Sequence, residues 1–122
     1  MAKIKIGIFG AGRGVDIAQN LMLLDCEIVA LCDFNEKRRN EGLRNLGMAV
    51  ATFENFDDFI EQEMDAVVLA NYFHEHTPYA IKCFEKGIHV FSECISNGTM
   101  AEGVELIRAF EKSNSIYMLA EN

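Results

Sequence analysis

Short apolar runs alternate with segments of helical spacing along this whole chain, and no other feature constrains its fold as strongly. The runs are rich in β-branched residues, as buried strands are, whereas the intervening segments repeat apolar residues every three or four positions. We predict strands at residues 4–9, 27–32, 49–52, 66–70, 89–92 and 116–120, and helices at residues 15–24, 36–46, 56–60, 79–85 and 100–112.

Strands that alternate with helices form a parallel sheet, because each right-handed crossover lays a helix on one face and returns the chain to the same edge. A chain of 122 residues with 50% hydrophobic content can bury one core, so residues 1–122 are expected to form a single domain. Six strands complete the dinucleotide-binding pattern. The predicted fold is therefore α/β, a doubly wound, parallel six-stranded Rossmann sheet of order 3-2-1-4-5-6 with helices on both faces.

Capping residues mark the start of two of the predicted helices. Thr77 followed by Pro78 predicts an N-cap with proline at the first helical position, and Gly87 predicts the end of that helix. Thr99 and Glu102 match the capping box, in which each side chain satisfies a free backbone N–H of the other residue.

The bulk composition excludes several classes of partner. The formal net charge is −8, from 11 basic and 19 acidic side chains, so the chain offers no positive field for nucleic acid. No apolar stretch approaches the roughly 18 residues that a membrane span needs. The four cysteines show no Cys-x-x-Cys pair, which favours free thiols in a reducing, cytoplasmic setting.

A glycine-rich turn, Gly10-Ala11-Gly12-Arg13-Gly14, follows the first predicted strand. Glycine at 10 permits a tight turn, and glycine at 12 lets a pyrophosphate approach the backbone at the positive end of the next helix. The third glycine of G-x-G-x-x-G is expected at position 15, but Val15 stands there. The turn therefore favours a dinucleotide site over the alternative of a strand-to-helix turn that only needs small residues.

An acidic residue, Asp33, follows the second predicted strand and lies 21 residues beyond Gly12. Its carboxylate can accept hydrogen bonds from the adenosine ribose and repels a 2′-phosphate, so we predict NAD, with NADP disfavoured. Phe34 is expected to lie against the adenine. Arg38 or Arg39 could instead hold a 2′-phosphate, although a solvated helix face is the preferred interpretation of both arginines.

The segment after the fourth predicted strand is also expected at the ligand edge of the sheet. Ala70 and Asn71 are predicted to contact the cofactor, and His76 to lie near its nicotinamide end. His74 and His76 suggest a metal site, but no further ligand stands at a recognisable spacing, so no metal is predicted. A plain polar loop is the alternative for His74.

Glu93 and Cys94 follow the fifth predicted strand. Burying a carboxylate beside a buried strand costs desolvation free energy unless a polar group contacts it. Glu93 is therefore predicted to contact a cofactor ribose. No cationic residue is adjacent to Cys94 in the sequence, so we interpret this thiol as structural.

These sites together resemble the N-terminal domain of the Gfo/Idh/MocA oxidoreductase family. The similarity extends along the chain through Ile6 to Arg13, Asp33, Asp65 to Ala70, His76, Gly87 to Val90 and Glu93. The resemblance implies an NAD(P)-dependent enzyme that transfers hydride to or from a sugar, polyol or related hydroxy compound. It also implies a larger C-terminal domain that supplies the substrate pocket.

The chain departs from this family in two respects. The family usually has Glu-Lys-Pro after the fifth strand, with the lysine near the transferred hydride, whereas Cys94 and Ile95 follow Glu93 here. The catalytic residues therefore stay open. The chain ends at Asn122, just beyond the last predicted strand, so we expect a fragment that binds cofactor without turnover and whose exposed edge could pair two copies as a homo-oligomer.

Two other functions fit parts of the pattern. The spacing of Gly10, Gly12 and Gly14 also suits the S-adenosylmethionine turn of a methyltransferase, but Ile8 stands where that motif usually has an acid. A nucleotide-sensing module without chemistry fits the missing lysine, and fold analogy does not separate it from an enzyme.

Overall fold

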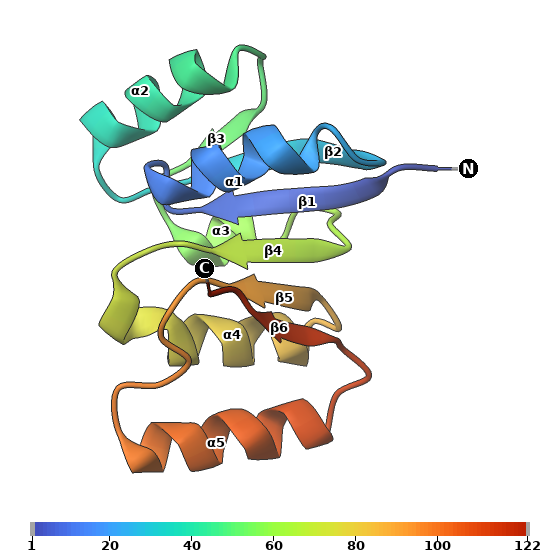
Figure 1. Cartoon of the computed structure of the whole chain (residues 1–122), viewed down its shortest axis with the longest axis vertical. Helices are drawn as coiled ribbons and strands as arrows, with labels where there is room; N and C mark the ends of the chain where they lie inside the picture. Colours follow the sequence, from blue (N-terminus) through green and yellow to red (C-terminus); the bar gives the residue numbers. More distant parts are fainter. Residues whose placement is uncertain (1, 122) are drawn as a thin grey trace.

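The computed structural model of the chain describes residues 2–121, which form one six-stranded parallel sheet of order β3-β2-β1-β4-β5-β6 (Figure 1). The strands are β1 (Ile4–Phe9), β2 (Cys26–Cys32), β3 (Ala51–Phe53), β4 (Ala66–Leu69), β5 (His89–Ser92) and β6 (Tyr117–Leu119). The helices are α1 (Arg13–Leu21), α2 (Glu36–Leu46), α3 (Phe56–Phe59), α4 (His76–Glu85) and α5 (Met100–Glu111), with a short 3-10 helix η1 (Phe73–Glu75) before α4. This arrangement confirms the predicted Rossmann topology.

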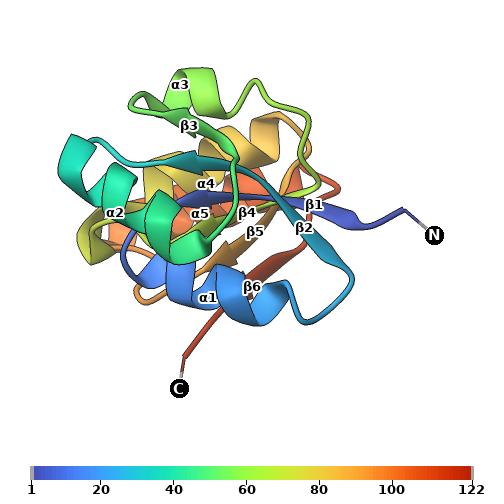
Figure 2. The ribbon, with the colours of Figure 1, turned by 90° about the horizontal axis from the view of Figure 1, so that it is seen from above.

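Helices cover both faces of the sheet, and α1 and α3 lie on opposite sides of it (Figure 2). One core cluster joins the sheet to α1 and α2 through residues such as Val15, Ala18 and Leu46. The other joins the opposite face to α3, α4 and α5, with Phe59 and Leu106 among its buried side chains. Because β1, β2 and β4 are packed on both faces, their apolar residues run almost without interruption.

The strand registers bring the carboxyl ends of four strands to one edge of the sheet. Phe9 pairs with Cys32 on one side and with Leu69 on the other, and Leu69 pairs with Ser92. The residues that follow these strand ends therefore meet at that edge, and they are Gly10, Asp33, Ala70 and Glu93. In an open α/β sheet this is where a ligand binds, at the point where the strand order reverses.

The capping box at the start of α5 is confirmed. The Thr99 hydroxyl accepts a hydrogen bond from the Glu102 N–H at 3.1 Å, and the Glu102 carboxylate accepts from the Thr99 N–H at 3.2 Å. Each side chain thus satisfies a backbone donor that the helix leaves free.

The predicted cap of α4 is wrong. The helix begins at His76, directly after η1, and its N-cap is Glu75, so Pro78 still lies in the first turn. The Thr77 side chain is buried and donates its hydroxyl hydrogen bond to the carbonyl of Ser96 at 2.8 Å. Because Thr77 already lies inside the helix, its side chain does not cap the helix start. The end of the helix is as predicted, since Lys86 caps it and Gly87 follows with a φ of 72°.

Other element ends differ from the prediction by a few residues. Strand β3 is displaced toward the C-terminus, and α1 begins at Arg13 and ends at Leu21 because residues 22–25 form a turn. Within residues 2–121, no helix is both long enough and apolar enough to cross a bilayer. The four cysteines are free thiols, while the cytoplasmic setting stays a prediction.

Candidate cofactor-binding site

The fold itself requires glycine at position 10. Gly10 has a φ of +103°, and a Cβ there would lie 2.3 Å from the carbonyl oxygen of Ala70. Its N–H donates to the carbonyl of Cys32 at 2.9 Å, which ties the turn to the end of β2. The first glycine of the motif therefore makes the tight turn between β1 and α1.

The fold does not require glycine at position 12 for packing. Gly12 is the N-cap of α1, and a Cβ there would have no heavy atom within 4 Å. Its φ of −82° lies outside the left-handed region that favours glycine. The space beside Gly12 lies at the positive end of a nine-residue helix, where an anion would be stabilised by free N–H groups. Glycine at 12 therefore leaves room for something that is not part of the chain.

Gly14 performs the packing role of the missing third glycine. A Cβ at Gly14 would lie 2.6 Å from Cγ2 of Ile8, so its small size lets α1 approach β1 closely. Gly42 allows α2 to lie close to the glycine-rich turn, because a Cβ at this position would lie 2.8 Å from the Cβ of Ala11. The motif is thus shifted by one residue at its third position but retains its function in packing.

Asp33 is fixed against the glycine turn by two backbone donors. One carboxylate oxygen accepts from the N–H of Ala11 at 2.9 Å, and the other accepts from the N–H of Asn35 at 2.9 Å. The guanidinium of Arg39 donates to the Asp33 carbonyl at 2.8 Å. Each carboxylate oxygen keeps a second lone pair for a ligand hydroxyl.

A cavity of about 590 Å³ opens between the turn and the ends of β2 and β4. Its walls come from residues 9–13, from residues 33–35, from residues 70–72 and from one side of α2. Nine of the twelve predicted contact residues border it: Gly10, Ala11, Gly12, Arg13, Asp33, Phe34, Arg38, Ala70 and Asn71. The sequence therefore located most of the residues that gather at this cavity.

The two arginines of α2 behave differently. Arg38 is exposed and its guanidinium carbon lies 5.9 Å from the centre of the Tyr72 ring, at the cavity wall. Arg39 is partly buried through its bond to Asp33. The preferred interpretation, a solvated helix face, is therefore wrong for Arg39.

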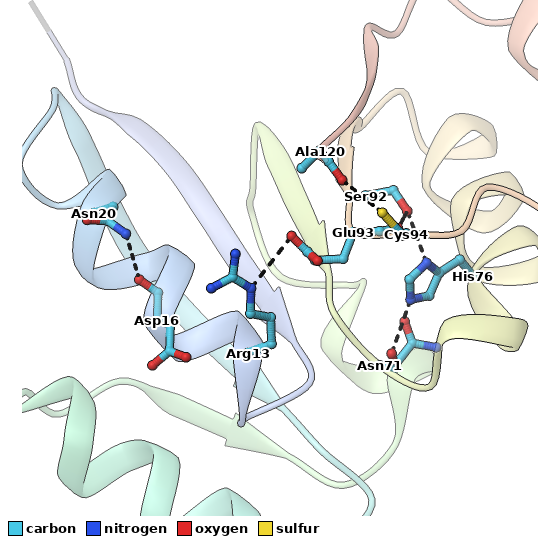
Figure 3. A network of polar contacts seen from close by, with 9 residues as sticks. All are labelled: Arg13, Asp16, Asn20, Asn71, His76, Ser92, Glu93, Cys94 and Ala120. Atoms are coloured by element: carbon cyan, nitrogen blue, oxygen red, sulfur yellow. Dashed lines mark hydrogen bonds and ion pairs between the residues drawn. The ribbon is translucent and has the colours of Figure 1, made fainter. Parts of the chain in front are cut away.

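Gly14, His76 and Glu93 do not border the cavity. Glu93 forms an ion pair with Arg13, whose Nε lies 3.7 Å from a carboxylate oxygen of Glu93, and this pair joins the start of α1 to the end of β5 (Figure 3). The Cys94 thiol donates to the carbonyl of Ala120 at 3.4 Å, which suits a structural role. The peptide bond between Cys94 and Ile95 is cis.

His76 lies behind the cavity, with 2% of its surface exposed. Its Nε2 lies 3.1 Å from the carbonyl oxygen of Asn71, and its Nδ1 lies 3.0 Å from that of Ile95 and 3.2 Å from the Ser92 hydroxyl (Figure 3). The imidazole thus connects the loops that follow β4 and β5. His74, by contrast, is exposed beside Glu75, and no metal-binding cluster occurs among the described residues.

The side-chain amide of Asn71 supports a ligand in this cavity. Both its oxygen and its nitrogen are buried, and within residues 2–121 neither has a hydrogen-bond partner. A buried amide without partners is costly, whereas a bound group with donors and acceptors would satisfy it. Together with the open space at Gly12, this orphaned amide shows that the residues present fit a dinucleotide.

Several cavity residues were missed by the sequence analysis. Tyr72 follows Asn71 directly, and Glu41, Gly42 and Asn45 lie on the side of α2 that faces the turn. Helical spacings of three, four and seven residues from Arg38 could have indicated the last three, but only after α2 was known to pass close to Ala11.

The sequence matches the GFO_IDH_MocA family, described as an oxidoreductase family with an NAD-binding Rossmann fold, over residues 4–121. The myo-inositol 2-dehydrogenase of Thermotoga maritima is 28% identical over 121 residues, which are 98% of this chain and 36% of that protein. A glycosyl hydrolase family 109 protein of Stenotrophomonas maltophilia is 26% identical over 133 residues, covering 98% of this chain and 29% of that protein.

A solved structure agrees with these matches. The scyllo-inositol dehydrogenase of Lactobacillus casei, with bound cofactor NAD(H) and scyllo-inositol, superposes with a TM-score of 0.87 at 25% identity, over 97% of this chain and 36% of that chain. The chain thus spans about a third of the length of these relatives. The family match favours an oxidoreductase over the methyltransferase alternative. This chain belongs to the Gfo/Idh/MocA oxidoreductase family and is an NAD-binding Rossmann-fold domain of it.

Proposed function

We propose that this chain is the cofactor-binding half of a dehydrogenase cleft, which uses NAD in preference to NADP to oxidise or reduce a sugar, a polyol or a related hydroxy compound. The observation that carries the proposal is the pairing, in one cavity, of the open space at Gly12 with the fixed carboxylate of Asp33. The related inositol dehydrogenases support the substrate class.

Different residues of the cavity would bind different parts of NAD. The free N–H groups at the start of α1 would hold the pyrophosphate, and Asp33 would accept the ribose hydroxyls while repelling a 2′-phosphate. The amide of Asn71 would gain the partners that it lacks. NAD, when bound, supplies the carrier for the transferred hydride.

The acid–base groups of the reaction are proposed to lie outside this chain. Cys94 takes the place of the family lysine, and its thiol is engaged with Ala120. We therefore expect residues 1–122 to bind NAD without turnover, and the substrate pocket and any homo-oligomer contact to depend on the rest of the protein.

A second function, nucleotide sensing without chemistry, is favoured by the same missing lysine. The two functions differ in one measurement on the full-length protein. Reduction of NAD in the presence of a polyol supports the dehydrogenase, whereas tight NAD binding with no reduction across a panel of sugars and polyols supports the sensor.

The binding proposal is tested by Gly12→Val, compared with Ala101→Val as a control. Both positions are exposed at the start of a helix, but only Gly12 borders the cavity. Calorimetric titration should show NAD binding in the wild type and in Ala101→Val, and its loss in Gly12→Val, because the valine side chain fills the space for the pyrophosphate. Unchanged affinity in Gly12→Val would show that the turn is merely structural.

A further inference from the structure

His76 is a buried polar side chain that lies behind the cofactor cavity and outside its lining. It is the first residue of α4, and 2% of its surface is exposed. Burying an imidazole costs free energy unless its ring nitrogens find hydrogen-bond partners. The partners of this ring lie at the end of β5 and in the loops that follow β4 and β5, so His76 occupies the junction between the two loops (Figure 3).

The two loops are joined by a long backbone contact and by shorter contacts through His76. The N–H of Ile95 donates to the carbonyl of Phe73 at 3.5 Å, beyond the usual range of about 2.7–3.2 Å. The Nε2 atom of His76 lies 3.1 Å from the carbonyl oxygen of Asn71. Its Nδ1 atom lies 3.0 Å from the carbonyl oxygen of Ile95 and 3.2 Å from the Ser92 hydroxyl. The imidazole therefore ties the loop after β4 to the loop after β5.

The chemistry of these partners favours hydrogen on Nε2 of the ring. A neutral imidazole donates from one nitrogen and accepts at the other, whereas a carbonyl oxygen only accepts. With hydrogen on Nε2, this nitrogen donates to Asn71, and Nδ1 accepts from the Ser92 hydroxyl, which can rotate away from the Glu93 carbonyl at 2.9 Å. With hydrogen on Nδ1 alone, the lone pair of Nε2 would face a carbonyl oxygen. The Nε2–H form therefore gives both nitrogens a partner.

Asn71 is the residue through which this hydrogen bond reaches the cavity. The preceding residue is fixed, because the N–H of Ala70 donates to the carbonyl of Phe9 at 2.8 Å. The carbonyl of Asn71 itself is held by His76. Both polar atoms of the Asn71 amide are buried, and within residues 2–121 neither has a partner. A backbone held on both sides of this residue fixes where the amide starts, so less freedom is lost when a ligand binds it.

We propose that His76 is a positioning residue, whose Nε2–H holds the Asn71 backbone so that the Asn71 amide meets the bound cofactor. This role rests on the proposed NAD site, and it requires no contact between His76 and NAD. Loss of the bond should lower the affinity for NAD, because an amide on a freer loop must be ordered before it binds.

Two substitutions of His76 separate the roles of its ring nitrogens. Glutamine places its amide nitrogen about where Nε2 lies, and asparagine, one methylene shorter, places it about where Nδ1 lies. In calorimetric titrations His76→Gln should bind NAD within about threefold of the wild type, whereas His76→Asn should bind it about tenfold more weakly. His74→Asn is the matched control, since His74 is an exposed neighbour outside the cavity lining, and its affinity should be unchanged.

A double-mutant cycle shows whether His76 acts through Asn71. Asn71→Ala removes the amide and should itself weaken NAD binding by about tenfold. In that background His76→Asn should change the affinity by less than about twofold, because the group that it positions is gone. A structural role of His76 that does not involve the amide would weaken binding equally in both backgrounds.

Nitrogen-15 NMR of the histidine rings tests the hydrogen bond in the wild type without NAD. His89 provides an internal reference, because its Nδ1 accepts from the N–H of Ile116 at 2.8 Å and its ring hydrogen therefore lies on Nε2. Above neutral pH, Nε2 of His76 should carry hydrogen as Nε2 of His89 does. The signals of His76 are assigned by their loss in His76→Gln.

Three results would overturn the positioning role: an Nε2 of His76 without hydrogen, equal NAD affinities of His76→Gln and His76→Asn, or additive losses in the double variant. If the wild type bound NAD and the two variants bound it equally, only the positioning role would fail. If the wild type bound no NAD, the proposed function itself would fail, and the positioning role with it.

Discussion

Replacing Gly10 by alanine should destabilise the domain far more than replacing Gly12, although the two glycines belong to one turn. At Gly10 the new methyl group would lie 2.3 Å from a backbone carbonyl, in a residue whose φ is +103°. Overpacking costs about 1–3 kcal/mol and a left-handed conformation about 1–2 kcal/mol, so the loss should be about 2–5 kcal/mol. This is a large part of the 5–15 kcal/mol typical of a domain.

The same substitution at the other glycines gives a graded control. Gly14→Ala places a methyl group 2.6 Å from a side-chain carbon of Ile8, so the loss should be about 1–3 kcal/mol. The methyl group of Gly12→Ala meets no atom within 4 Å, so the loss should be about 1 kcal/mol at most, because it comes only from alanine being a poorer N-cap than glycine. Urea unfolding followed by circular dichroism measures all three free energies. Equal losses at Gly10 and Gly12, or none at Gly10, would refute this assignment of roles.

Asp33→Ala should lower the preference for NAD over NADP by about tenfold or more in calorimetric titrations, because a fixed negative charge no longer opposes the 2′-phosphate; an unaltered ratio would count against the ribose role. Thr99→Ala should lower the free energy of unfolding by about 1 kcal/mol in urea, since the capping box at α5 is lost, and an unchanged value would show that the box contributes nothing. Burial raises the pKa of the Cys83 thiol from 9.0 to about 12, and burial together with the nearby Asp33 carboxylate does the same for Cys32. Between these two pKa values the folded state keeps the thiol protons while the unfolded state releases them. The contribution of the two thiols to the free energy of unfolding should therefore be complete below pH 9 and fall as the pH rises from 9 to about 12. A free energy of unfolding that stays constant across that window would contradict the burial of these thiols.

The topology was readable from the sequence because each strand and helix carries its own periodicity. Buried strands such as β1 and β4 are short apolar runs, and the capping box at Thr99 is a local signal whose partner stands three residues away. The cap expected at Thr77 is absent because η1 runs directly into the helix at His76, which places Thr77 in the first turn of α4. The Thr-Pro pattern does not reveal where the preceding helical turn begins.

The candidate site was readable where it follows strand ends, and not where it depends on how helices pack. Gly10, Asp33 and Ala70 come directly after β1, β2 and β4, so the register of the sheet brings them together. Tyr72 became visible only when the position of Arg38 across the cavity was known. Its side chain is separated from Arg38 by 34 positions in the sequence, and no periodicity links the two.

Calorimetric titration of NAD, NADP and S-adenosylmethionine into this chain would show which cofactor the glycine turn binds. NAD should bind, NADP should bind more weakly because of Asp33, and S-adenosylmethionine should not bind. Binding of S-adenosylmethionine with no binding of NAD would contradict the assignment of this turn to NAD.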